Sequence, residues 1–186
     1  MTDFLGKVVQ DQDVIKSILA KLPGFKGYIE RQNRRDADKL LRDKIAREYE
    51  SLWQRISSLQ KEMLNQGGLA YVDDMESAAV KLRAFIDRVR TATYGHSSLF
   101  NAVKINEAEL ARLYEFDLSL LNMVDAMSSA LDNIEAAIGT DGLAVTIRQL
   151  VTLSTQCIET FNQRVDVITT QTAAGSTAIT EVQSSQ

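Results

Sequence analysis

The sequence predicts an all-α fold: an elongated antiparallel four-helix bundle with a weaker N-terminal amphipathic helix and a flexible C-terminal tail. The 186 residues include 1 proline, whereas average usage of roughly 5% would give about nine, so few points force a helix to break. Four long segments repeat apolar residues at intervals of three and four residues. The length suits one domain, which we divide into an N-terminal segment (1–24), the bundle (25–171) and a disordered tail (172–186).

Residues 4–22 form the weaker amphipathic candidate. Most of their large apolar side chains cluster on one side at 100° per residue, but Asp11 lies within that side and interrupts it. Pro23 and Gly24 then end the segment, as a turn-forming pair does.

The strongest helical pattern runs from about Tyr28 to Gln66, where Gly67 and Gly68 stop it. A helix of about 38 residues would measure roughly 57 Å, which suits an elongated bundle. Its apolar residues keep a heptad seam for three repeats. They are Ile45, Tyr49, Leu52, Ile56, Leu59 and Met63.

Three further helices are predicted downstream, over about 73–93, 106–138 and 143–170. The first opens with Asp73 as a candidate N-cap, and glycines at both ends of the 139–142 turn separate the other two. Many residues of the last segment are β-branched and also suit a strand. A helix is favoured there because the three preceding heptad helices need a fourth helix to complete the bundle.

Charge is unevenly distributed along the chain. Residues 1–66 carry 13 Lys/Arg and 10 Asp/Glu, and residues 67–186 carry 8 and 15, so the halves have balances of +3 and −7 within the overall −4. An acidic chain of this kind argues against dedicated nucleic-acid binding, which needs a strongly basic surface.

A basic face at the start of the first long helix is one candidate interaction surface. The apolar seam fades before residue 42, so we expect the first three turns to project from the bundle or bend away from it. There they would meet acidic protein, phospholipid head groups or another subunit's acidic half; a solvated helix start is the alternative that we prefer. The members of this face are Arg31, Arg34, Arg35, Lys39 and Arg42.

Asp117 is the most unusual residue, because it occupies a seam position between Leu113 and Leu120 where an apolar side chain is expected. An unpaired buried carboxylate costs several kcal/mol, so a buried Asp117 would need a partner. One interpretation is a polar ligand or register-setting contact inside the bundle. The interpretation that we favour is a slight roll of the helix, with Phe116 inward and Asp117 at the boundary.

The helix that carries Asp117 is apolar on most of its sides, so more than one neighbour should cover it. Either the N-terminal helix or another subunit would pack there. We expect Tyr114, Leu118 and Leu121 to form part of that contact.

The single histidine, His96, and the single cysteine, Cys157, exclude most site chemistry. An intrachain disulfide, a Cys/His zinc cluster and paired Glu-x-x-His iron sites all need more copies. We therefore predict no catalytic residue, metal ligand or cofactor, and we identify no small-molecule substrate. Cys157 lies among apolar residues and suits a core thiol in a reducing compartment, which together with the lack of a membrane span or signal peptide predicts the cytoplasm.

The leading hypothesis is a non-enzymatic helical scaffold or adaptor that acts through protein–protein contacts, with a protein partner or with itself as a homo-oligomer. A second hypothesis is a peripheral membrane-surface scaffold that uses the N-terminal amphipathic segment, although its lysines are offset by aspartates. A metal- or ligand-binding bundle centred on Asp117 is a more distant third.

Overall fold

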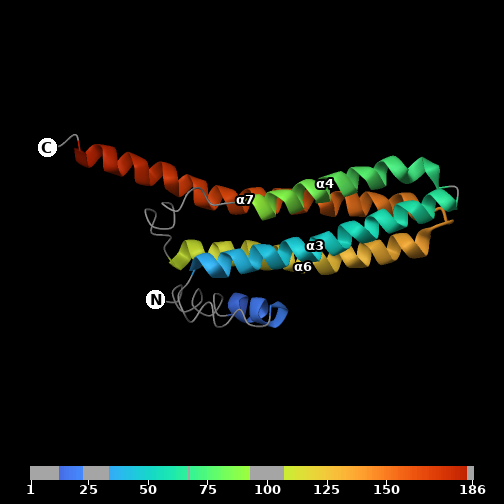
Figure 1. Cartoon of the computed structure of the whole chain (residues 1–186), viewed down its shortest axis with the longest axis horizontal. Helices are drawn as coiled ribbons and strands as arrows, with labels where there is room; N and C mark the ends of the chain where they lie inside the picture. The colour runs from blue at the N-terminus through green and yellow to red at the C-terminus, as the bar shows by residue number, and fades with distance from the viewer. Residues whose placement is uncertain (1–12, 23–33, 67, 93–106, 184–186) are drawn as a thin grey trace.

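The computed structural model describes residues 13–22, 34–66, 68–92 and 107–183, with side chains at 13–22, 38–66, 68–92 and 111–166 (Figure 1). All elements in these ranges are helical, which confirms the predicted all-α bundle. A helix over residues 13–21 comes first. The others are α3 (Arg34–Asn65), the short 3-10 helix η1 (Leu69–Tyr71), α4 (Val72–Thr91), α6 (Glu107–Ala137) and α7 (Leu143–Gln183).

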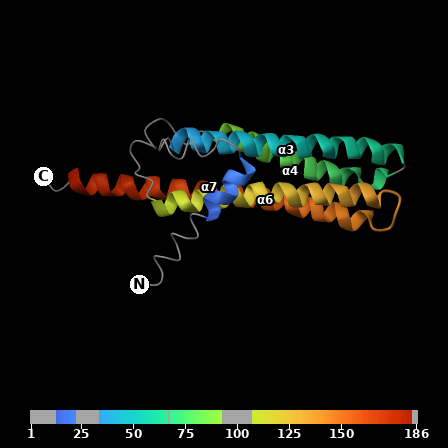
Figure 2. The ribbon, with the colours of Figure 1, turned by 90° about the horizontal axis from the view of Figure 1, so that it is seen from below.

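Successive long helices run antiparallel, and they form two hairpins laid side by side (Figures 1 and 2). One hairpin is α3–α4 and the other is α6–α7. Across the two hairpins α3 packs against α6 and α4 packs against α7, and both of these pairs run parallel. The helices α4 and α6 therefore lie diagonally across the bundle, and the chain connects them through residues 93–106, a longer link than either hairpin turn.

Glycines end α3 and α6 at one end of the bundle, which we call the turn end. The backbone N–H of Gly68 donates to the carbonyl of Met63 at 2.8 Å, and a Cβ on Gly68 would lie 3.1 Å from that oxygen. Gly139 follows α6 with a φ of 80°, the left-handed conformation that glycine adopts after a helix without strain. Both turns are thus set by local sequence.

The α7 helix continues to Gln183, whereas the composition predicts a disordered tail from residue 172. Each residue added to an existing helix gains a hydrogen bond without a new nucleation step, and residues 166–183 contain no proline. The single Gly175 costs only about 1 kcal/mol in a helix interior. The structure therefore differs from the expectation over residues 172–183, and α7 extends past the ends of the other three helices (Figure 1).

The predicted heptad residues form the core. All six seam residues of α3 are buried, together with Met75, Ala79, Leu82, Ile86 and Val89 of α4. The segment 143–170, whose β-branched residues also suit a strand, is helical throughout. Its residues Ile147, Leu150, Cys157 and Phe161 close the fourth side of the core.

The N-terminal helix, residues 13–21, lies across the side of the bundle formed by α3 and α6 (Figures 1 and 2). Ile18 and Leu22 are buried in the common core, and Val14, Ile15 and Leu19 pack against it while half-buried. The part of the predicted helix before residue 13, including Asp11, lies outside the described residues.

No helix within the described ranges combines the length and the apolar character that crossing a membrane requires.

Candidate functional site

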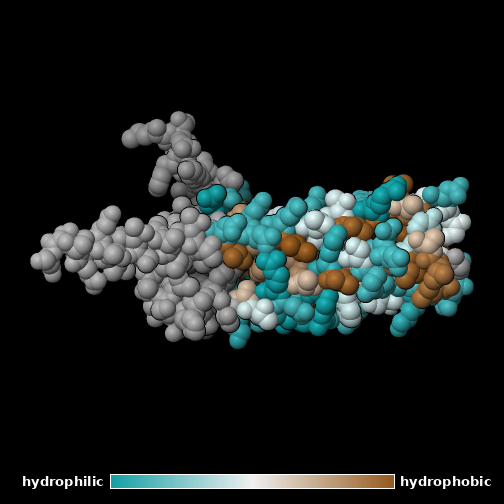
Figure 3. Space-filling model, turned by 90° about the horizontal axis from the view of Figure 1, so that it is seen from above, coloured by the Kyte–Doolittle hydropathy of each residue, from teal (hydrophilic) through white to brown (hydrophobic). Residues whose placement is uncertain are grey.

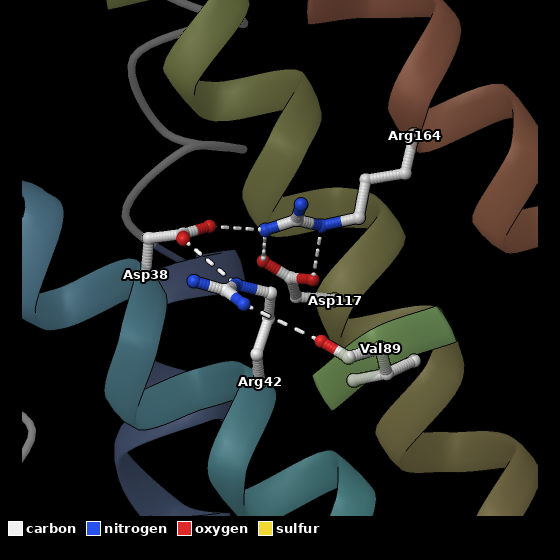
Figure 4. Close-up of polar contacts among 5 residues, drawn as sticks. All are labelled: Asp38, Arg42, Val89, Asp117 and Arg164. Carbon is white, nitrogen blue, oxygen red and sulfur yellow. Dashed lines mark hydrogen bonds and ion pairs between the residues drawn. The ribbon is translucent and has the colours of Figure 1, made fainter. Parts of the chain in front are cut away.

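The most unusual group in the core is a buried ion pair between Asp117 of α6 and Arg164 of α7 (Figure 4). Both residues are 1% exposed. Arg164 Nε donates to Asp117 Oδ1 at 2.6 Å and Arg164 Nη2 donates to Asp117 Oδ2 at 3.0 Å, so the guanidinium holds both carboxylate oxygens. Such bidentate, charge-assisted pairs are among the strongest hydrogen-bonded contacts in proteins.

Two further ion pairs and one hydrogen bond extend this group to the other two long helices. Arg164 Nη2 also donates to Asp38 Oδ1 of α3 at 2.6 Å, and Arg42 Nε donates to Asp38 Oδ2 at 2.9 Å. Arg42 Nη1 then donates to the carbonyl of Val89 near the end of α4 at 3.3 Å (Figure 4). Because that carbonyl belongs to the last turn of α4, a cation there also complements the negative end of the helix dipole.

We call Asp38, Arg42, Asp117 and Arg164 the ionic layer. It contains two carboxylates and two guanidinium groups, so its formal charge is zero, and it has contacts with all four long helices. Asp38 and Arg42 lie on the same face of α3 because they are four residues apart. The layer lies toward the end of the bundle opposite the two tight turns, which we call the open end (Figure 1).

Burial dominates the electrostatics of the ionic layer. It raises the pKa of Asp117 because the ionised form has lost its water, and the carboxylate of Asp38 raises that pKa further, whereas the charge of Arg42 lowers it. The two hydrogen bonds from Arg164 act in the same direction as Arg42. Arginine stays protonated in proteins, so the layer holds its positive charges and matches them with two carboxylates.

Next to the ionic layer lies an aromatic layer. The ring centroids of Tyr49 and Phe85 are 4.6 Å apart, and Phe161 meets Phe85 edge-on at 5.9 Å. The hydroxyl of Tyr49 donates to the carbonyl of Leu120 at 2.9 Å. These contacts place one aromatic side chain each from α3, α4 and α7 at the same level of the core.

Cys157 completes the aromatic layer, with its Sγ 3.3 Å from the hydroxyl of Tyr49 and 3.7 Å from Sδ of Met127. Burial raises the pKa of Cys157 to about 11, and it raises the pKa of Tyr49 above its ordinary range as well. A nucleophilic cysteine needs a depressed pKa and access to solvent. Cys157 has neither, so its chemistry is that of a packed core thiol.

The preferred interpretation of Asp117 as a boundary residue is wrong. Asp117 is fully buried while Phe116 is half-buried, so the helix does not roll as we expected. The physical reason is the partner: Arg164 supplies two hydrogen bonds and an opposite charge, which is the condition under which a carboxylate remains in a core.

The predicted basic face divides in the structure. Lys39 is exposed, but Arg42 belongs to the ionic layer, with its side chain 13% exposed. Arg31 lies outside the described residues, and the side chains of Arg34 and Arg35 do too. The start of α3 does not leave the bundle, because Asp38 and Leu41 are both buried. Toward the start of the helix, the buried seam continues from Ile45 to Leu41, four residues earlier, and then to the polar Asp38.

The expected contact surface on α6 is partly covered within one chain. Tyr114 and Leu121 are buried and Leu118 is half-buried. Lys21 of the N-terminal segment reaches the same side of α6 and bonds Asp125 at 2.8 Å. The N-terminal helix and α6 are therefore neighbours at this surface.

Arg164 is the functional-site residue that sequence reasoning missed. The heptad frame assigned Val165 to the seam of α7, since Val165 is apolar, but Val165 is half-buried and Arg164 is buried. A signal was present: Asp117 in the seam of one helix requires a base in the seam of another, and Arg164 lies three residues after Phe161.

Outside the core, the face of the bundle drawn in Figure 3 is mixed in polarity over the described residues. Its exposed large apolar residues are 48–72% exposed, and three of the four lie near the turn end. They are Leu64, Leu69, Val80 and Val145. Among the described residues, no cluster of three or more His, Cys, Asp or Glu side chains has an arrangement that would hold a metal ion.

Comparison with known proteins gives no match to a family model, to a curated protein or to a solved structure.

Proposed function

We propose that this protein is a non-enzymatic helical scaffold that acts through protein–protein contacts and associates with itself. The observation that carries the proposal is the length of α7, which runs from Leu143 to Gln183 and continues past the ends of α3, α4 and α6 (Figure 1). Residues 172–183 alone would extend a helix by about 18 Å. A helix that leaves its bundle offers a surface on which another helix packs.

The sequence of this projecting part supports helix pairing. Ile168, Gly175 and Val182 follow the buried Phe161 at successive intervals of seven residues, and Thr172 and Ile179 lie between them. This continues the heptad frame of the bundle into a part of α7 that the other three long helices do not reach, and heptad spacing is the pattern by which helices pair in coiled coils. Small residues in the middle of the frame would let two helices approach closely.

The polar residues of the core pair with one another, which also supports a structural role for the protein. The ionic layer matches its charges among its own members, and Cys157 is buried with a raised pKa. A reduced, buried thiol of this kind suits the cytoplasm, where we place the protein. The N-terminal helix buries Ile18 and Leu22 against the bundle, which favours protein contact over a membrane surface as the role of that segment.

Mass measurement by light scattering over a concentration series tests this proposal. We expect the full chain to show a mass above that of one chain, rising with concentration, and a variant ending at residue 171 to lose the part of that association that the projecting end of α7 provides. A matched variant, Ile179→Glu, places one charge in the projecting heptad frame and should have the same effect without shortening the chain. A full chain that stays monomeric at all concentrations would overturn the proposal.

A further inference from the structure

The N-terminal helix occupies a docking seat on the α3–α6 side of the bundle. Its inward residues are spaced at i, i+1, i+4, i+5 and i+8, which is the pattern of an amphipathic helix laid in an apolar groove. They are Val14, Ile15, Ile18, Leu19 and Leu22. The outward residues Asp13, Lys16, Ser17 and Ala20 are exposed. The contact is therefore one face of a short helix on a separate helical surface.

The N-terminal helix is held less firmly than the four long helices. It spans only residues 13–21, and helices of that length are not stable on their own in water. Its ion pair to the bundle, Lys21 with Asp125, is largely exposed on the Asp125 side, and exposed ion pairs add little stability. Its opening therefore belongs to the low-energy local motions that leave the rest of a fold intact.

A surface hollow of about 160 Å³, open to solvent, lies at the edge of the seat. Two residues of the α6 side, Leu118 and Val124, remain half-buried. The residues that line the hollow are Lys21, Lys44, Glu48, Leu121, Val124 and Asp125.

We propose that this helix is exchanged between two copies of the chain. Residues 13–22 of the second copy occupy the α3–α6 seat of the first, and residues 13–22 of the first copy occupy the same seat of the second. The inference rests on the self-association proposed above and adds a specific surface to it. A second copy carries the identical apolar pattern and a lysine that matches Asp125, so every contact made within one chain is available between two. Exchange of an identical element is a low-cost route to a symmetric dimer.

The chain between helix and bundle is long enough for this exchange. Residues 23–33 separate Leu22 from the start of α3, and a segment of that length spans at most about 38 Å when extended. That reach exceeds the width of about 10–12 Å of one helix with its side chains. A helix released from its own seat is therefore able to reach the seat of a neighbouring copy.

Cross-linking between single-cysteine variants tests the exchange. Lys21→Cys and Asp125→Cys replace the two ends of the ion pair, and the native Cys157 is buried and does not compete. The two variants are mixed, incubated and treated with a short bis-maleimide. We expect a cross-linked species that contains one chain of each variant and grows with protein concentration.

In the control mixture, the second cysteine is placed at a position remote from the seat instead of at Asp125. Asp141→Cys lies in the exposed α6–α7 turn at the turn end, so its mixture with Lys21→Cys should yield only the small amount that random collision produces. The double variant Lys21→Cys/Asp125→Cys checks the seat within one chain and should cross-link internally at low concentration. Circular dichroism confirms that each variant keeps its helical content.

Two outcomes would overturn the exchange. One is an internal cross-link in the double variant with none between chains in the mixture, and the other is an equal yield from the Asp141→Cys control. If the full chain still associates by light scattering in either case, the scaffold proposal stands and only the exchange fails. A synthetic peptide of residues 11–24 gives a second measurement: it should bind the full chain, and it should bind somewhat more weakly when Asp125 is replaced by lysine, because that lysine repels Lys21.

Discussion

The two ends of the bundle are held together by different physics. At the turn end, short glycine turns join the helices and the core is apolar, with Met63, Met75 and Leu143 buried. At the open end, the same four helices meet in the ionic layer, whose partners are as far apart in sequence as Asp38 and Arg164. Apolar packing tolerates small shifts of register, whereas a bidentate ion pair requires one geometry.

This difference indicates a division of labour between the two ends. The turn end fixes which helices form hairpins, because each turn joins consecutive elements. The ionic layer fixes how the two hairpins align, because Arg164 of α7 bonds Asp38 of α3. Arg42 bonds the carbonyl of Val89 within the α3–α4 hairpin. A shift of one helical turn would separate these charges and leave them buried without partners, which is costly.

The largest effect is expected from Arg164→Ala. This change leaves the buried carboxylate of Asp117 without its partner and removes one of the two arginines from Asp38. Removing one member of a buried ion pair costs about 3–5 kcal/mol, so the free energy of unfolding should fall by that amount. Urea denaturation followed by circular dichroism measures the change.

The matched control is Arg148→Ala, an exposed arginine on the same helix. Surface substitutions of this kind change stability by less than about 0.5 kcal/mol. Equal losses in the two variants would show that the ionic layer has no special importance at the open end.

A smaller loss is expected at alkaline pH, from the aromatic layer. Burial raises the pKa of Cys157 from its ordinary 9.0 to about 11, so above about pH 9 the unfolded chain ionises while the folded chain stays protonated. Stability is therefore lost between about pH 9 and pH 11, by roughly 3 kcal/mol. Tyr49 acts in the same direction, since burial raises its pKa too.

Cys157→Ser isolates this contribution, because a serine hydroxyl does not ionise in the range. Denaturation of both proteins across the alkaline range should show a steeper decline for the native chain. If the two curves run parallel, Cys157 does not titrate as a buried thiol.

A still smaller effect is expected at the turn end from Gly139→Ala. Gly139 has a φ of 80°, and a side chain in the left-handed region costs roughly 1–2 kcal/mol. A Cβ at this position would have open space around it, so the cost should come from the backbone alone. Thermal denaturation measures it, and the exposed Ala136→Gly in the last turn of α6 reports the ordinary cost of glycine in a helix, about 1 kcal/mol.

The sequence was sufficient to predict the turn end and the apolar core. Heptad spacing from Ile45 to Met63 and the glycines at 68 and 139 are local signals, and each acts over a few residues. The ionic layer could be predicted only in half: Asp117 stood out in an apolar frame, but its partner lies 47 residues away. A frame drawn through apolar residues selected Val165 and passed over Arg164, because periodicity in one helix carries no information about a charge in another.

The sequence pattern also could not predict which helices pack against one another. The alternation of helix directions follows from the turns, but the parallel packing of α3 with α6 and of α4 with α7 depends on contacts between distant segments. The start of α3 illustrates the same limit. Its polar seam positions predicted a projecting helix, whereas Asp38 is buried because Arg164 of α7 and Arg42 of α3 itself compensate its charge.

The smallest net effect on stability, and the sharpest test of the two ends, is expected when the ionic layer is made apolar as a unit. Replacing Asp38 and Asp117 by Leu and Arg42 and Arg164 by Met removes the charges of the layer together, and such replacements are often neutral or stabilising by about 1–4 kcal/mol. The variant should therefore unfold no more easily than the native chain and far less easily than Arg164→Ala. Its hairpins, however, should lose their fixed alignment, because apolar contacts permit more than one register. Broadened or doubled amide resonances for α6 and α7, with unchanged helical content, would indicate that loss. A single sharp set of resonances would instead mean that apolar packing alone aligns the hairpins and that the two ends of the bundle are physically equivalent.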